Sequence, residues 1–92
     1  MKTNIMFHEQ FLSEAHHLIE AIKDLKSKGN IKESLQKSLE LCYLKVNYYG
    51  QFIDLYPDSS KAYWGYQDSY STALRELSNV RDKCMDAGVY EN

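Results

Sequence analysis

Residues 35–57 read LQKSLELCYLKVNYYGQFIDLYP, and this stretch decides the fold of the 92-residue chain. Its apolar side chains recur at alternating intervals of four and three residues: Leu35, Leu39, Cys42, Val46, Tyr49, Ile53 and Tyr56. That spacing is the period of an α-helix with one apolar face. Pro57 ends the pattern, because the residue before a proline is disfavoured in the helical conformation. The stretch therefore predicts a helix over about 31–56.

Two flanking segments repeat this periodicity. On the N-terminal side the apolar positions are Phe11, Ala15, Leu18, Ile22 and Leu25, widened by Leu12 and Ile19. On the C-terminal side they are Tyr63, Tyr66, Tyr70, Ala73, Leu77, Val80, Cys84 and Ala87. Gly29 and Gly88 follow the two segments and suit the left-handed residue that ends many helices. We expect helices over about 4–28 and 58–87, followed by a short C-terminal tail at 89–92.

Three long helices joined by very short turns pack antiparallel to their neighbours. The sequence therefore predicts an all-α fold, an antiparallel up-down-up three-helix bundle that forms a single domain over 1–92. A chain of this length has room for one hydrophobic core. Gly50 and Gly65 fall inside the predicted helices, where glycine can introduce a kink.

The charge balance narrows the classes of partner. Eleven Lys and Arg stand against thirteen Asp and Glu, for a net charge of −2. Domains that grip a nucleic-acid backbone usually carry a clear positive excess, so this small acidic protein is not expected to be one of them. No apolar run approaches the roughly 20 residues of a membrane helix, and charged residues interrupt the N-terminal segment. We expect a cytoplasmic protein without a membrane partner.

The sequence contains no catalytic, cofactor or metal motif, so we predict no enzyme activity and no cofactor. Glu14 and His17 have the Glu-x-x-His spacing of carboxylate metal sites, but the second motif that such sites need is absent. The two cysteines, Cys42 and Cys84, do not form a disulfide framework. If the chain reverses between Pro57 and Asp58, they lie about 16 Å apart along the helices, and both should be buried free thiols.

Aromatic residues are the informative feature. The chain has eight tyrosines, three phenylalanines and one tryptophan, and in the predicted bundle all but Tyr90 gather at one end. Trp64 points away from the apolar face of its own helix. The central helix also has a second apolar stripe: Leu41, Leu44, Tyr48 and Leu55. One alternative is that the first helix covers this stripe. The other is that the stripe stays exposed and forms an interface, either with a partner or between two copies in a homodimer.

We therefore expect the protein to bind a protein partner without chemistry of its own. The class would be an inhibitor or regulator of the antitoxin, immunity or anti-defence type, or an adaptor. The predicted partner-binding residues are Tyr43, Leu44, Tyr48, Trp64 and Asp68. The alternative is a nucleic-acid-associated regulator that uses the lysine-rich end of the bundle: Lys23, Lys26, Lys28, Lys32, Lys37, Arg75, Arg81 and Lys83.

Overall fold

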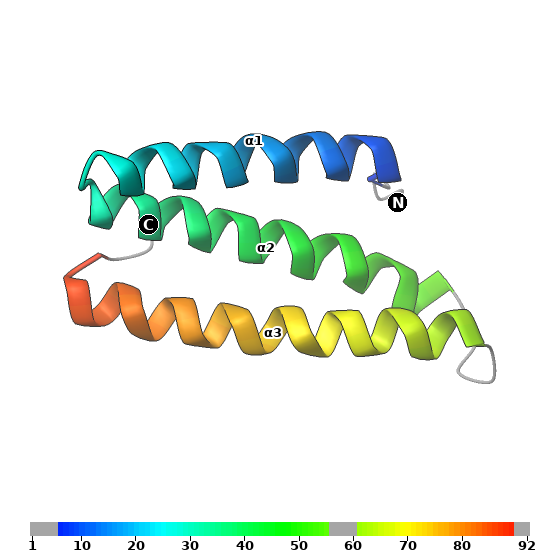
Figure 1. The fold of residues 1–92 in the computed structure, drawn as a ribbon. Helices are drawn as coiled ribbons and strands as arrows, with labels where there is room; N and C mark the ends of the chain where they lie inside the picture. The colour runs from blue at the N-terminus through cyan, green and yellow to red at the C-terminus, as the bar shows by residue number, and fades with distance from the viewer. Residues whose placement is uncertain (1–5, 56–60, 90–92) are drawn as a thin grey trace, which may run out of the picture.

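The computed structural model of the chain describes residues 6–55 and 61–89. Three helices account for most of these residues: α1 (His8–Ser27), α2 (Ile31–Leu55) and α3 (Lys61–Ala87). No strand occurs within the described ranges. Each helix runs antiparallel to the next (Figure 1). The predicted all-α, up-down-up three-helix bundle is confirmed.

The helix boundaries agree with the sequence except at the start of α1. Phe7 has extended backbone angles, φ −79° and ψ 156°, so the helix begins at His8 and not near residue 4. The earliest predicted helical residues, 4 and 5, lie outside the described residues. So do the expected last residue of the second helix, Tyr56, and the expected first residues of the third, 58–60.

Glycine ends two of the helices as predicted. Gly29 has φ +80° and Gly88 has φ +77°. At the end of α1, the Asn30 N–H donates to the Leu25 carbonyl at 2.8 Å and the Gly29 N–H donates to Lys26 at 3.1 Å. These two hydrogen bonds define a Schellman motif. In this motif the residue that follows the helix, here Gly29, adopts a left-handed backbone conformation.

The same motif closes α3 and extends the core. The Val89 N–H donates to the Cys84 carbonyl at 2.7 Å, and the Gly88 N–H donates to Met85 at 3.2 Å. Val89 is only 6% exposed and packs against the buried residues between α2 and α3. The expected tail therefore contains a core residue at its first position, while residues 90–92 lie outside the described part of the chain.

The three helices do not all pack against one another. α2 lies between α1 and α3 (Figure 1) and packs against both. Within the described residues, no Cα atom of α1 lies within 8 Å of one in α3. A closed three-helix bundle gives each helix two neighbours, whereas here only α2 has two. Among the described helices, α1 therefore packs directly on α2 and not on α3.

Two separate clusters of buried side chains form on opposite sides of α2. The cluster between α2 and α3 contains Leu39, Cys42, Leu77, Cys84 and Val89. The cluster between α1 and α2 contains Phe11, Ala15, Leu44 and Tyr48. The second apolar stripe of the central helix is thus largely covered by α1, although Leu55 at its end stays 55% exposed.

Neither internal glycine interrupts its helix, since α2 continues through Gly50 and α3 through Gly65. A Cβ atom added at Gly50 would lie 3.1 Å from Cε1 of Tyr70, whereas one at Gly65 would meet nothing within 4 Å. Gly50 is therefore the point at which the Tyr70 ring approaches the backbone of α2. Gly65 has no such packing role.

Both cysteines are free and buried, as predicted. The expected register between α2 and α3 is wrong, however. The Cys84 thiol donates to the carbonyl of Leu35 at 3.8 Å, so Cys84 lies level with Leu35 and not with Ile31. The prediction assumed that both helices run up to a reversal at residues 57–58, whereas α3 begins at Lys61. The two thiols are about one helical turn closer along the bundle than expected.

Candidate interaction surface

The aromatic residues mostly build the interior. Phe11 and Tyr48 stack with ring centroids 4.0 Å apart. Phe52 meets the edge of Tyr48 at 5.1 Å and stacks on Tyr66 of α3 at 4.2 Å. Such pairs add to the energy of simple apolar burial. The rings thus connect all three helices, and most of the aromatic end is packing and not surface.

Tyr48 has its polar group satisfied at the edge of this cluster. Its hydroxyl lies 2.9 Å from Nδ1 of His8, and burial raises the pKa of that hydroxyl above its ordinary value. His8, the first residue of α1, is exposed, so this hydrogen bond lies at the surface end of the cluster.

The chain before α1 is tied to α2 by two hydrogen bonds. The Met6 N–H donates to Oε1 of Gln51 at 3.0 Å, and Nε2 of Gln51 donates to the Met6 carbonyl at 2.7 Å. Phe7 follows Met6 and is 73% exposed, and Leu55, one helical turn beyond Gln51, is also exposed. Two large apolar side chains are therefore held at the open end of the α1–α2 pair.

The predicted partner-binding residues divide into two groups. Trp64 is 57% exposed, and Asp68, one turn later on α3, is exposed as well. Tyr43 is half-buried against the α2–α3 core. Leu44 and Tyr48 are 8% and 5% exposed. The expectation that these last two are surface residues is wrong, because α1 covers them.

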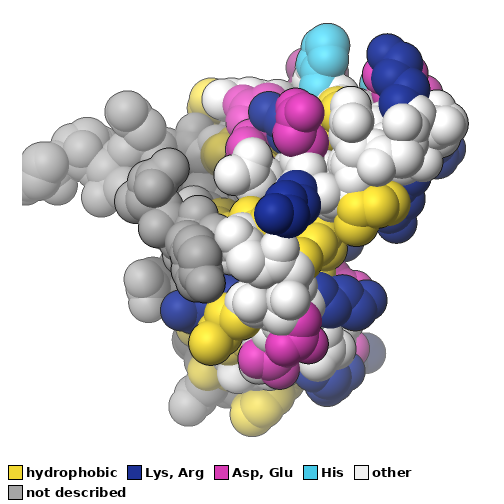
Figure 2. Space-filling model, turned by 90° about the vertical axis from the view of Figure 1, so that its left-hand side faces the viewer, with side chains coloured by type: hydrophobic (Ala, Val, Ile, Leu, Met, Phe, Trp, Pro, Cys, Tyr) yellow, Lys and Arg dark blue, Asp and Glu magenta, His cyan; other side chains and the backbone are white. Residues whose placement is uncertain are grey.

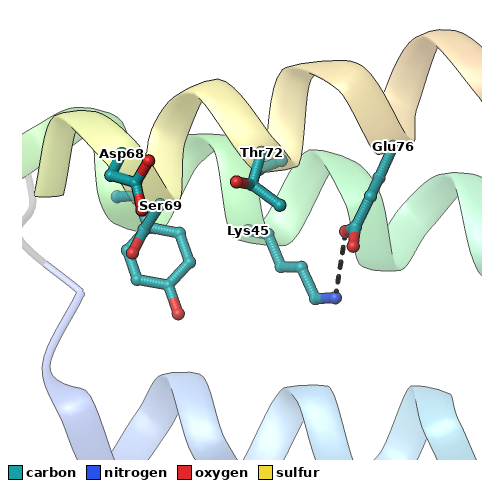
Figure 3. Close-up of a pocket in the computed structure, with 7 residues that line it drawn as sticks. Lys45, Asp68, Ser69, Thr72 and Glu76 are labelled. Carbon is teal, nitrogen blue, oxygen red and sulfur yellow. Dashed lines mark hydrogen bonds and ion pairs between the residues drawn. The ribbon is translucent and has the colours of Figure 1, made fainter.

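Asp68 lines a shallow groove between α2 and α3 (Figure 3). The groove has a volume of about 200 Å³ and is lined by Lys45, Tyr49, Asp68, Ser69, Thr72, Ala73 and Glu76. Pockets for drug-sized ligands are larger, roughly 300–1,000 Å³. The groove is the size of one or two side chains, so it suits contact with a protein surface better than binding of a cofactor.

A salt bridge crosses this groove. Nζ of Lys45 on α2 lies 3.3 Å from Oε1 of Glu76 on α3 (Figure 3). The Lys45 side chain is only 32% exposed, and that of Glu76 is 47% exposed. No sequence pattern indicated either residue as a groove component, since they are adjacent only through the α2–α3 register. That register was the part of the fold that sequence spacing placed wrongly.

The lysine-rich end carries charges of both signs, as Figure 2 shows for the face that looks out from that end. Three of its lysines lie close to carboxylates one helical turn away: Lys23 near Glu20, Lys28 near Asp24 and Lys37 near Glu40. All three pairs are solvent-exposed and contribute little to stability. Their effect is to reduce the positive potential of this end.

The remaining candidates carry no site. Glu14, His16 and His17 are all exposed, and the described residues contain no group of three His, Cys, Asp or Glu side chains that could hold a metal ion. None of the described helices is both long and apolar enough to cross a bilayer. No protein-family model, curated protein or solved structure matches this chain.

Proposed function

We propose that the chain is a small cytoplasmic protein without enzyme activity that acts by binding a protein partner, as an inhibitor, regulator or adaptor. The observation that carries the proposal is the 57% exposure of Trp64 on a well-formed helix. Tryptophan is among the residues most enriched at binding hot spots, because one rigid side chain buries a large apolar area. The ring meets Tyr63 edge to face, with centroids 5.1 Å apart, and that contact still leaves more than half of the side chain exposed.

The surroundings of Trp64 have the composition of an interface. We define the Trp64 surface as Trp64 together with the polar residues that line the groove, of which Asp68 lies one helical turn after Trp64: Lys45, Asp68, Ser69, Thr72 and Glu76. Protein interfaces typically combine an apolar anchor with a polar rim that supplies hydrogen bonds and excludes water. In this proposal Trp64 is the anchor, and Asp68 and the Lys45–Glu76 pair form the rim.

The buried members of the predicted site take a supporting role. Leu44 and Tyr48 hold α1 on α2, and Tyr43 packs against the α2–α3 core. These contacts pack the helices together, so their loss would affect binding only through the fold. The proposed contact residues are therefore on α3 and on the adjoining edge of α2.

The nucleic-acid alternative would use the opposite end of the bundle. The lysine–carboxylate pairs and the net charge of −2 both favour a protein partner over this alternative. The salt dependence of binding distinguishes the two proposals. Contacts with nucleic-acid phosphates release counterions, so the binding constant for a nucleic acid falls steeply as the salt concentration rises. A protein complex anchored by Trp64 should depend on salt only weakly.

The direct test is affinity capture from the organism that encodes the chain, with Trp64→Ala as the variant. Leu12→Ala is the matched control, since Leu12 is 50% exposed but lies on α1, no Cα atom of which comes within 8 Å of one in α3. The expected result is a specific protein that the wild type and Leu12→Ala retain and Trp64→Ala loses. Retention of the same protein by Trp64→Ala, or capture of nucleic acid alone, contradicts the proposal.

A further inference from the structure

Within the described residues, α1 packs on α2. Its buried residues, Phe11 and Ala15, lie against Leu44 and Tyr48, and no Cα atom of α1 comes within 8 Å of one in α3. Any α2 placed at the same position would satisfy α1 equally well, including the α2 of a second copy. Exchange of α1 between two copies would therefore keep the packing of α1 on α2.

The connection between α1 and α2 is short and turns at one residue. Only Lys28, Gly29 and Asn30 separate the two helices. Gly29 is the one residue among them with positive φ, and a Cβ atom there would meet nothing within 4 Å. The reversal of the chain thus depends on the backbone conformation of Gly29 and not on side-chain packing at the turn.

Straightening this turn would conserve backbone hydrogen bonds. In the hairpin, the Gly29 and Asn30 N–H groups donate to Lys26 and Leu25. In a continuous helix the same two donors would bond to Leu25 and Lys26 in the ordinary four-residue pattern. The two bonds are exchanged and none is lost. The conformation of Gly29 therefore sets the balance between hairpin and continuous helix.

We propose that Gly29 is a hinge at which two copies of the chain exchange α1 to form a domain-swapped dimer. In the dimer, 8–55 is one continuous helix, and two such helices run antiparallel with a twofold axis at Gly29. The α1 of each copy then covers Leu44 and Tyr48 of the other. Glycine opposes the exchange in two ways, since it tolerates the left-handed turn and weakens a continuous helix.

The matched pair Gly29→Ala and Gly88→Ala tests the hinge. Both glycines have positive φ and free space at Cβ, so alanine strains both turns equally, but only Gly29 joins two helices. Each protein is refolded at high concentration and analysed by size exclusion with light scattering. The association constant for dimer formation should be at least tenfold higher for Gly29→Ala than for the wild type. Gly88→Ala should match the wild type. A Gly29→Ala protein with wild-type association overturns the proposal.

A cross-link distinguishes exchange from side-by-side association. Met6 and Gln51 are hydrogen-bonded across the α1–α2 pair, so Met6→Cys with Gln51→Cys places two thiols near each other. In the monomer fraction the disulfide should form within one chain. That result also serves as the control that the two introduced cysteines are close enough to react. In the dimer fraction of the Gly29→Ala background it should join two chains on a denaturing gel. Linkage within single chains in that fraction overturns the proposal.

If Gly29→Ala fails to fold, a longer connection gives the opposite test. Insertion of three Gly and Ser residues after Gly29 interrupts the continuous helix that the exchange requires, and it should lower the dimer fraction of the otherwise unchanged chain below that of the wild type. A dimer fraction that stays the same or rises with the insertion contradicts the hinge. Circular dichroism on each protein confirms that helix content is retained.

Discussion

The ring of Phe11 lies flat against the ring of Tyr48, with centroids 4.0 Å apart and planes 5° apart. This contact closes the α1–α2 interface over the second apolar stripe of the central helix. Tyr48 is therefore a core residue, although its position on the second apolar stripe was also compatible with exposure at the surface. The proposed interaction surface therefore excludes Tyr48 and is centred on Trp64, which is 57% exposed on α3.

Substitutions at Tyr48 should act on stability. Tyr48→Ala removes the stack on Phe11 and leaves a cavity, so the free energy of unfolding should fall by about 3–5 kcal/mol. Tyr48→Phe keeps the ring and loses only the hydrogen bond to His8, for a loss of roughly 0.5–1.5 kcal/mol. Urea denaturation followed by circular dichroism measures both. Equal stabilities of the two variants would show that the ring is not part of the core.

The two internal glycines should respond differently to alanine. Gly65→Ala adds a good helix former in open space, so it should stabilise α3 by about 0.5–1 kcal/mol. Gly50→Ala gains the same propensity but places Cβ 3.1 Å from the Tyr70 ring, which offsets much or all of the gain. Thermal denaturation of both variants ranks them. A Gly50→Ala protein more stable than Gly65→Ala would contradict the close approach of Tyr70.

Stability should decrease in alkaline solution. Burial raises the pKa of the Cys42 thiol, and the nearby Glu76 carboxylate raises it further, while burial also raises the pKa of the Tyr48 hydroxyl. The folded chain therefore holds these protons more tightly than the unfolded chain does. Their contribution is fully present below the ordinary thiol pKa of 9.0 and is lost as the pH rises through the folded-state values.

Urea midpoints measured from neutral pH to about pH 11 check this sign. The midpoint should fall above pH 9, and Tyr48→Phe, which has no hydroxyl to titrate, should show a shallower fall. A midpoint that is constant or rises over this range would mean that neither group is buried in its protonated form.

Much of the fold could be predicted because its determinants are local. The four-and-three spacing defines each helix, and Gly29 and Gly88 mark two of the helix ends through their own backbone preference. The start of α1 was placed too early, since nothing in residues 4–7 opposes a helix by composition. The extended conformation of Phe7 accompanies a contact between Met6 and Gln51, which are 45 residues apart.

The candidate site was harder to predict because it depends on which helix covers which stripe. Leu44 and Trp64 look alike in sequence, since each is apolar and lies off the α2–α3 seam. α1 packs on one and does not reach the other. The Lys45–Glu76 bridge likewise depends on the α2–α3 register, which local spacing could not set. The polar helical neighbours of Trp64, Asp68 and Ser71, indicated an outward direction for its ring but left open whether the ring folds back over the first helix or the tail, and the structure leaves it 57% exposed.

The central claim is that Trp64 anchors a protein partner, and the affinity of the captured partner tests it most directly. Isothermal titration of that partner with wild type, Trp64→Ala and Leu12→Ala gives three dissociation constants under one condition. Loss of a hot-spot anchor should weaken binding by about 2 kcal/mol or more, roughly 30-fold, while Leu12→Ala binds as the wild type does. An unchanged dissociation constant for a folded Trp64→Ala protein would contradict the account.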